Sequence, residues 1–218
     1  MLQYQRTYLF PPKPTLIGLL GAALGFEDWQ LTSLYEDVWA SVILCQRYGF
    51  ARDLWGITKI KTSGKTEHAV VVREMLHCPS YRIFFSPKSS SSVKLRDMET
   101  AFANPAYPLT LGRSDELVMI NSCDISDLQP ANQAAWFRYT VLPFDYRKQR
   151  CVLEKINEST DGILELPQVF RLPVAYSYDK DRKRRVTQYD VFTHVFGTGV
   201  SLDSKEGWCD DGKFFFLY

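Results

Sequence analysis

The fold of this chain is decided by residues 8–25, which read YLFPPKPTLIGLLGAALG. Three prolines within four positions keep the first part of this stretch extended, because proline fixes φ and pushes the preceding residue out of the α region. From about Thr15 the apolar residues recur at helical spacing, which predicts a helix. Glycine inside a helix costs up to about 1 kcal/mol relative to alanine, so we expect another segment to pack closely against this one. The small residues that would allow that approach are Gly18, Gly21, Ala22 and Gly25.

Length, composition and charge limit the class of protein. A chain of 218 residues forms one sizeable domain or two small ones that share a core. Its 45% hydrophobic and 14% aromatic content predicts a packed globular protein. No stretch approaches the ~18 uninterrupted apolar residues of a membrane span, and the N-terminus lacks the layout of a signal peptide, so we expect a cytosolic protein with no membrane partner. The net charge of +1 excludes a polycation that binds nucleic acid through its bulk field, so any such binding must use local patches.

Cysteines and histidines do not form the patterns of a metal site or of a common enzyme. The cysteines are odd in number and contain no C-x-x-C pair, which argues against a disulfide framework and against zinc. We therefore expect free, mostly buried thiols. No histidine has metal-ligand spacing, and no P-loop or G-x-S-x-G motif is present, so we expect no metal, no cofactor and no classical enzyme. The five cysteines are Cys45, Cys78, Cys123, Cys151 and Cys209.

The opening stretch, extended by Thr7, resembles a known family. TYLFPPKPTLIGLLGAALG is similar to the N-terminal signature of the Cas five family, a CRISPR-associated subunit of type I RNA-guided surveillance complexes. Only residues 1–7 precede the proline-rich part of this signature. Members of the family usually open with an arginine-bearing segment, and the resemblance implies that Arg6 stands in for part of it. Three further stretches resemble the same family in the same order: VVREMLHCPSYRIFF at 71–85, FANPAYPLTLGRSDE at 102–116 and LPVAYSYDKDRKRRVTQYDV at 172–191.

The order of the expected elements predicts an α+β fold. Apolar residues in 27–48 recur at three- and four-residue intervals, so the helical interpretation continues there, whereas hairpins and antiparallel strands follow later in the chain. The resemblance implies a ferredoxin-like RNA-recognition domain of the RAMP type over residues 1–125. It also implies a protruding, thumb-like hairpin at about 55–73 and a smaller β-rich part over 126–218.

A lysine-bearing hairpin is the first candidate RNA-binding element. Alternation over 57–62, a Ser-Gly-Lys turn and a returning valine-rich run predict two paired strands. Lysines commonly occur on solvated edge strands, where their charge prevents pairing with a strand of another chain. They are also what a finger that contacts phosphates would carry, and the resemblance favours this second interpretation. These lysines are Lys59, Lys61 and Lys65.

A basic turn is the second candidate. Residues 180–185 hold five basic side chains among six and lie close to three tyrosines. Such a turn is either solvated and without a role, or it binds single-stranded RNA through phosphate contacts and base stacking. Arg113 lies in a further family-like motif. The predicted RNA-binding residues are thus Lys59, Lys61, Lys65, Arg113, Arg182, Lys183, Arg184 and Arg185, with no catalytic residue.

A metal-independent ribonuclease is the alternative that needs the fewest residues. A general base and a lysine that stabilises the phosphorane charge suffice to drive a 2′-hydroxyl onto its phosphate. One branch of the Cas five family, in type I-C systems, is such an enzyme and uses a tyrosine with an adjacent lysine-histidine pair. This chain lacks that pair. Tyr48, Lys65 and His68 would form an equivalent site only if the fold brought them together.

The resemblance implies a non-catalytic, crRNA-binding subunit of a I-B-like Cascade in antiviral defence. Such a subunit caps the crRNA 5′ handle, contacts the Cas seven backbone subunit through its hairpin and docks the large subunit. Target DNA near the PAM is then contacted only indirectly, and base pairing by the guide reads the target sequence. Two alternatives stay open: a pre-crRNA endoribonuclease, and a β-rich protein-interaction module without an RNA role.

Overall fold

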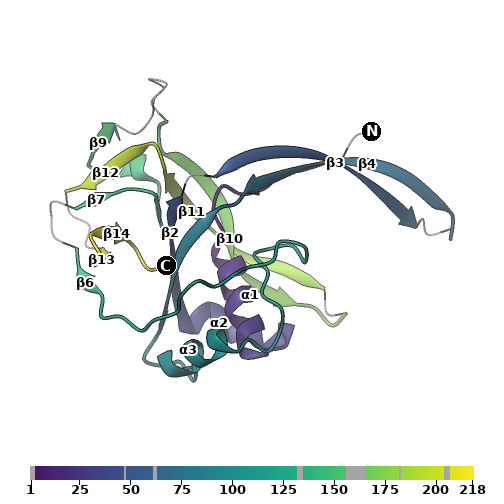
Figure 1. Cartoon of the computed structure of the whole chain (residues 1–218), viewed down its shortest axis with the longest axis horizontal. Helices are drawn as coiled ribbons and strands as arrows, with labels where there is room; N and C mark the ends of the chain where they lie inside the picture. The colour runs from purple at the N-terminus through teal and green to yellow at the C-terminus, as the bar shows by residue number, and fades with distance from the viewer. Residues whose placement is uncertain are drawn as a thin grey trace. The chain divides into compact units, whose positions relative to one another are not determined.

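The computed structural model describes residues 3–46, 48–60, 63–131, 135–155, 165–181, 183–203 and 207–218 (Figure 1). Strands predominate over helices in these ranges, as in an α+β protein. The chain divides into two compact units. The hairpin unit comprises Met1–Leu9 and Leu44–Tyr81, and the sheet–helix unit comprises Phe10–Ile43 and Arg82–Tyr218.

The hairpin unit is a three-stranded sheet in the order β1-β4-β3. Strand β3 (Gly49–Ile60) pairs antiparallel with β4 (Thr66–His77) over its whole length, from Gly49 opposite His77 to Ile60 opposite Thr66. The short β1 (Gln3–Gln5) runs parallel to β4, with Tyr4 opposite Val72. The hairpin predicted at about 55–73 is therefore present and extends further at both ends.

The opening stretch forms helix α1 (Lys13–Leu24) of the sheet–helix unit, as its spacing predicted. Pro12 is the extended N-cap, and Gly25 ends the helix at φ 76°, a left-handed conformation that favours glycine. A methyl group added at Gly21 would collide with the Leu31 side chain, so close packing explains this glycine. At Gly18 the same addition meets nothing within 4 Å, and the close-packing expectation is wrong there. The fully buried face of the helix consists of Leu16, Ile17 and Leu20.

The helix expected over residues 27–48 is only partly present. A 3-10 turn, η1 (Asp28–Gln30), leads into the short α2 (Leu31–Asp37), after which the chain becomes strand β2 (Val38–Gln46). The prediction is therefore wrong for residues 38–46. β-Branched and aromatic side chains suit a strand, and burial of residues 40–44 removes the alternation that would have distinguished it from a helix.

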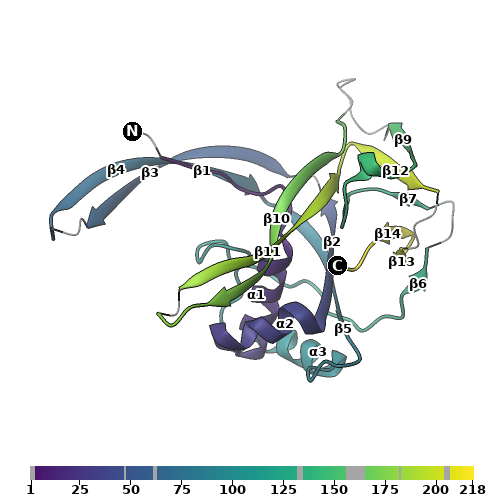
Figure 2. The ribbon, with the colours of Figure 1, turned by 180° about the vertical axis from the view of Figure 1, so that it is seen from behind.

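A five-stranded sheet in the order β10-β11-β8-β2-β5 carries the helices. Helices α1 and α2 lie beside β10 (Figure 2), where Ile17, Leu34 and Tyr35 pack with Tyr176. Strands from both sides of residue 125 contribute to this sheet, and separate folding of 1–125 and 126–218 stays a prediction. The remaining bounds are β5 Ser80–Pro87, α3 Leu95–Ala103, β8 Thr140–Leu142, β10 Gln168–Tyr178 and β11 Arg184–Val195.

A second sheet of the same unit has the order β6-β13-β14-β7-β12-β9. Its strands are short, and its core includes Phe137, Val200 and Phe216. The bounds are β6 Gln129–Pro130, β7 Trp136–Phe137, β9 Cys151–Lys155, β12 Thr198–Leu202, β13 Trp208–Asp210 and β14 Lys213–Phe215.

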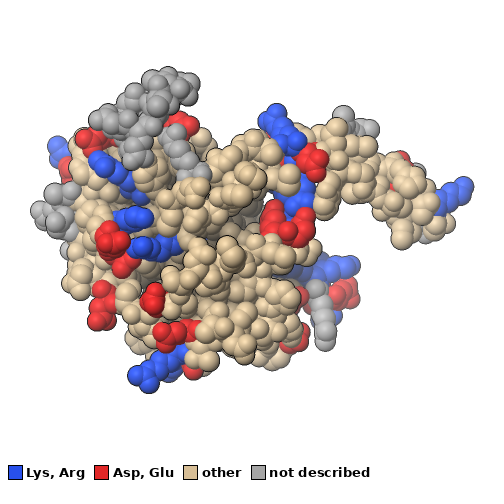
Figure 3. Space-filling model, in the orientation of Figure 1, with Lys and Arg blue, Asp and Glu red and all other residues tan. Residues whose placement is uncertain are grey.

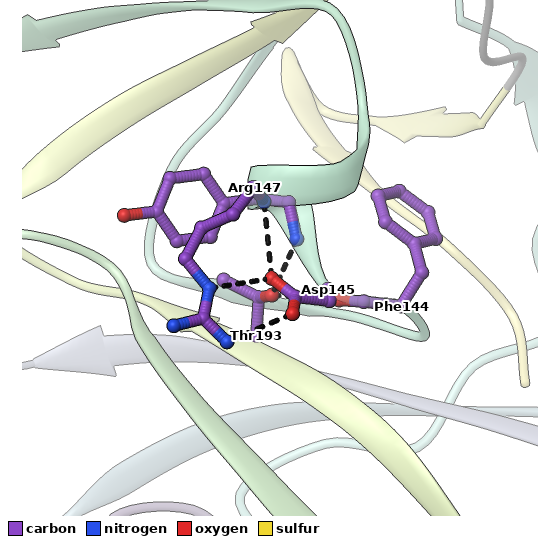
Figure 4. Close-up of polar contacts among 5 residues, drawn as sticks. Phe144, Asp145, Arg147 and Thr193 are labelled. Carbon is purple, nitrogen blue, oxygen red and sulfur yellow. Dashed lines mark hydrogen bonds and ion pairs between the residues drawn. The ribbon is translucent and has the colours of Figure 1, made fainter.

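The connection between β8 and β9 is fixed to β11 by partly buried polar contacts (Figure 4). The Thr193 hydroxyl donates to the Phe144 carbonyl at 2.6 Å and accepts from the Tyr146 N–H at 3.1 Å. In the 3-10 turn η2 (Tyr146–Lys148), Asp145 accepts from the Arg147 Nε and Nη2 at 2.8 Å each, which holds the pKa of Asp145 below its usual value. These contacts hold the turn against β11 through Thr193.

All five cysteines are free, as predicted, but they are not mostly buried. Cys45, Cys78 and Cys123 are exposed, and the other two are half-buried. Cys45 lies near the end of β2 and Cys78 follows β4, so neither occupies the middle of a covered strand. Among the described residues, no helix has the length and apolarity that a membrane span requires.

Candidate nucleic-acid interface

Of the lysines predicted to bind RNA near the tip of the β3–β4 hairpin, only Lys65 is exposed among the described residues. Lys65 is exposed and follows Gly64, which has φ 77°. Lys59 is half-buried and lies opposite Glu67 in the strand register. Opposite charges directly across an antiparallel pair attract each other, so Glu67 offsets part of the Lys59 charge. Lys61 lies outside the described residues.

A cluster of arginines and aromatic rings lies on one face of the hairpin unit, nearer its base. The guanidinium carbon of Arg6 lies 6.0 Å from the centroid of the Tyr4 ring, and that of Arg52 lies 5.9 Å from it. Arg52 is also 5.9 Å from the Phe50 ring centroid. We call these four residues the Tyr4 face. Its two rings are about half exposed.

Glu74 holds two side chains of the Tyr4 face, those of Tyr4 and Arg52, in place. Its carboxylate accepts a hydrogen bond from the Tyr4 hydroxyl at 2.6 Å and forms an ion pair with Arg52 at 3.5 Å. The hydrogen bond from Tyr4 is the main reason that the pKa of Glu74 lies below its usual value, and the same bond raises the pKa of Tyr4. A carboxylate that stays ionised therefore fixes both the ring and the guanidinium.

Arg73 and Trp55 form a second stack within the hairpin unit. The Arg73 guanidinium carbon lies 4.3 Å from the Trp55 ring centroid. Arg73 is buried, whereas Trp55 is 43% exposed. Arg52 and Trp55 are three residues apart along β3, so they point to opposite faces of the ribbon, since successive strand residues alternate. Both faces thus carry an exposed aromatic ring next to a guanidinium.

Sequence reasoning singled out Arg6 but missed Arg52, Arg73 and the rings of this unit. The alternation of Phe50, Arg52 and Leu54 along one strand was a signal that could have placed Arg52 on the same face as an aromatic ring. Tyr4 carried no such signal, because only the parallel pairing of β1 with β4 brings it to this face.

Charges in the β10–β11 turn are largely paired within the turn itself. Arg185 Nε lies 3.0 Å from Asp179 Oδ2, and Lys183 Nζ lies 3.9 Å from Asp181 Oδ2. Asp179 also accepts the backbone N–H of Lys183, which is the main cause of its lowered pKa. The predicted residues Lys183 and Arg185 therefore lie together but share their charge with two aspartates. Arg182 lies outside the described residues.

Arg184 belongs to the packing of the sheet–helix unit. Its guanidinium carbon lies 4.6 Å from the Tyr176 ring centroid, and Tyr176 in turn packs at 6.1 Å on the buried Tyr35. Burial raises the pKa of Tyr35 to about 12. Further along the same strands, Arg171 lies 5.0 Å from the ring centroid of Tyr189, which is 47% exposed and is the more accessible ring.

Arg113 is held within its own turn. Its Nη1 lies 3.2 Å from Glu116 Oε1, and its backbone N–H donates to Glu116 Oε2 at 3.3 Å. Gly112, at φ 115°, allows the preceding bend. Arg113 is half-buried and therefore offers little of its charge to a ligand.

Acidic side chains accompany basic ones on the visible surface (Figure 3). On the face that Figure 3 shows, Lys and Arg are scattered among Asp and Glu and do not merge into one basic field. This pattern agrees with the net charge of +1. Any nucleic-acid contact on this face must therefore be local.

The residues of the ribonuclease alternative do not come together. Tyr48 precedes Gly49, which pairs with His77, whereas His68 pairs with Thr58. Ten residues of strand at about 3.3 Å each separate the two positions by about 30 Å. His194 is a core residue that stacks on Phe10 at 5.1 Å, and burial lowers its pKa to about 4. Among the described residues, no cluster of His, Cys, Asp and Glu has the arrangement of a metal site.

The fold and these surfaces together define an α+β protein with a long β-ribbon that carries arginine–aromatic stacks. Neither a protein-family profile nor a curated protein matches the chain. It is similar to a chain of a CRISPR RNA-guided surveillance complex, with 14% identity and a TM-score of 0.52 over 89% of this chain and 83% of that one. This similarity shows a shared fold and confirms the predicted fold class. A crystal structure of a Cas protein is also similar over 93% of this chain and 90% of that one, at 15% identity, but its TM-score of 0.37 carries no argument.

Proposed function

We propose that this chain is an RNA-binding subunit of a CRISPR RNA-guided surveillance complex. The observation that carries the proposal is the Tyr4 face. Single-stranded RNA is held by cations on its phosphates and by rings or guanidinium planes on which its bases stack. Arg52 next to the half-exposed rings of Tyr4 and Phe50 supplies both kinds of contact. The fold shared with a chain of such a complex supports the same assignment.

Within this proposal the chain has the role that its sequence resemblance implies. It caps the crRNA 5′ handle in the cytosol, contacts the Cas seven backbone subunit and the large subunit, and performs no catalysis. The separation of Tyr48 from His68 along the ribbon supports the non-catalytic assignment. Incubation with repeat RNA in EDTA tests it, because site-specific cleavage would favour an endoribonuclease instead.

RNA binding is tested with the purified chain and a labelled single-stranded RNA that carries the repeat-derived 5′ handle. For Arg52→Gln we expect the slope of log K against log salt to become shallower by about 0.7, the value for one lost phosphate contact. For Phe50→Leu we expect a loss of about 1–3 kcal/mol if a base stacks on that ring. Both side chains are exposed, so neither change removes a core contact.

Arg150→Gln is the matched control. Arg150 is also exposed and also forms an ion pair, at 3.3 Å with Asp203, but it lies in the sheet–helix unit and stacks on no ring of the described residues. Its loss should leave the salt slope unchanged. If the unaltered chain bound no RNA at low salt, or if Arg52→Gln behaved like Arg150→Gln, the Tyr4 face would not be an RNA interface.

A further inference from the structure

Two lysines and a tryptophan meet in the sheet–helix unit. Lys13 is the first residue of α1, Trp39 lies on β2, and Lys88 directly follows β5. The Lys88 Nζ lies 4.2 Å from the Trp39 ring centroid, and the Lys13 Nζ lies 5.6 Å from it. We call these three residues the Lys13–Lys88 site.

The positive charge of this site is only partly offset by a carboxylate, that of Asp190. Lys13 is only 8% exposed, and in the described part of the chain neither ammonium group forms an ion pair. Burial and the nearby Lys88 lower the pKa of Lys13 to about 8, and the opposing influence of Asp190 is smaller than either. Lysine is rarely buried unless it is paired, because the ammonium group loses its hydration.

Helix α1 adds to the positive potential at this point. The N-terminal end of a helix carries a partial positive charge, so a lysine at the first position is unfavourable and an acidic residue is preferred. The first turn of α1 has no acidic residue, and Pro12 provides no side-chain cap. Pro14 has no N–H group, and the N–H groups of Thr15 and Leu16 already donate to the Pro12 carbonyl. What this site offers to an anion is therefore mainly its two ammonium groups, besides the N–H of Lys13.

We propose that the Lys13–Lys88 site binds a phosphate group of single-stranded RNA, with an adjacent base stacked on the exposed part of the Trp39 ring. Trp39 is 41% exposed, so ring surface is accessible beside the two cations. Phosphate and aromatic base occur side by side in single-stranded nucleic acid, and lysine binds phosphate as a point charge. This inference rests on the proposed function. It adds an RNA-binding position in the sheet–helix unit to the one that the Tyr4 face provides in the hairpin unit.

Salt dependence of RNA binding tests the proposal. For the double variant Lys13→Gln, Lys88→Gln we expect the slope of log K against log salt to become shallower by about 0.7, as for one lost phosphate. For Trp39→Leu we expect about ten-fold weaker binding, within the range of a lost base stack. Lys148→Gln, which removes an exposed lysine of η2 in the same unit, should leave the slope and affinity unchanged.

Proton uptake by the unaltered protein gives a second measurement that does not depend on how a variant folds. A phosphate next to Lys13 stabilises its protonated form, so RNA binding at pH 8.5 should take up protons. Calorimetry in two buffers of different ionisation enthalpy measures this uptake. Lys13→Gln should abolish it, and Lys148→Gln should not.

The outcomes distinguish the site from the proposed function. An unchanged salt slope in the double variant together with no proton uptake would overturn the site, while a shallower slope for Arg52→Gln in the same assay would leave the proposed function standing. No RNA binding by the unaltered chain would overturn both. Saturable binding of inorganic phosphate that the double variant abolishes, with RNA binding unaffected, would reject RNA as the ligand in favour of free phosphate.

Discussion

Lys13 should make the stability of this protein rise with pH above about pH 8. Its pKa is about 8 in the folded chain and 10.5 in an ordinary environment. The unfolded chain therefore binds more protons between these values, so the free energy of unfolding increases from about pH 8 to about pH 10.5. A shift of 2.5 pKa units corresponds to at most about 3.4 kcal/mol, of which about 2 kcal/mol is recovered between pH 7 and pH 9.5.

Replacing Lys13 with methionine removes this dependence, because the variant has no ammonium group to desolvate. Urea denaturation of both proteins between pH 7 and pH 9.5 gives the difference in unfolding free energy as a function of pH. The comparison is needed because burial raises the pKa of the half-buried Cys151 thiol, which makes stability fall with pH in both proteins alike. Lys13→Met should be the more stable protein at pH 7, and its advantage should shrink by about 2 kcal/mol at pH 9.5.

Lys88→Met provides the internal control for this reasoning. Lys88 is the second cause of the low pKa of Lys13, after burial, so its removal should raise that pKa and reduce the pH dependence without abolishing it. A difference between Lys13→Met and the unaltered protein that stays constant from pH 7 to pH 9.5 would refute the description of Lys13 as a buried, unpaired cation. It would also remove the electrostatic basis of the Lys13–Lys88 site.

Two further predictions concern the packing of the sheet–helix unit. Gly18→Ala should stabilise the protein by up to about 1 kcal/mol, since the added methyl group enters open space in a helix. Gly21→Ala should be less stable than Gly18→Ala by about 1–3 kcal/mol, because its methyl group collides with Leu31. Thermal denaturation measures the stability of both variants. His194 has a pKa of about 4 instead of 6.5, so it should make stability fall as pH decreases from about 6.5 to about 4. Denaturation at pH 4.5 and pH 7 should show that His194→Phe lacks this fall. An equal loss of stability between the two pH values in the variant and the unaltered protein would contradict a neutral, buried imidazole.

Elements defined by neighbouring residues were predictable from the sequence. The prolines before α1 and the leucine spacing within it act over a few residues, as do the alternation and the glycine turn of the β3–β4 hairpin. Strand β2 was not predictable in the same way. It lies inside a five-stranded sheet between β8 and β5, so residues 40–44 are all buried and read as a continuous apolar run.

The candidate site was less predictable than the fold, because its residues come from distant parts of the chain. Lysine and arginine runs drew attention to the hairpin tip and the β10–β11 turn, but a sequence does not show that Asp179 and Asp181 pair with the basic residues of that turn. Tyr4 reaches Arg52 only through the β1–β4 pairing, and Lys13 reaches Lys88 only through the packing of α1 against the sheet. The number of basic residues along the sequence therefore overestimated the available charge at the hairpin tip and the β10–β11 turn, and it did not indicate the Tyr4 face or the Lys13–Lys88 site.

The distribution of paired and unpaired cations sets how strongly this chain alone can bind RNA. Arg113, Lys183 and Arg185 are paired with carboxylates. Arg52 is also paired, with Glu74, but its side chain is 63% exposed beside two rings, so we count it with Lys65 and the Lys13–Lys88 site as the three phosphate contacts of the proposal. Three contacts give a slope of log K against log salt of about −2, far smaller than for a protein with six to ten. Stacking must then supply much of the affinity, and RNA held also by neighbouring subunits would bind this chain as part of a multivalent assembly. A measured slope steeper than about −4 would mean that further cations outside these three positions contact the RNA.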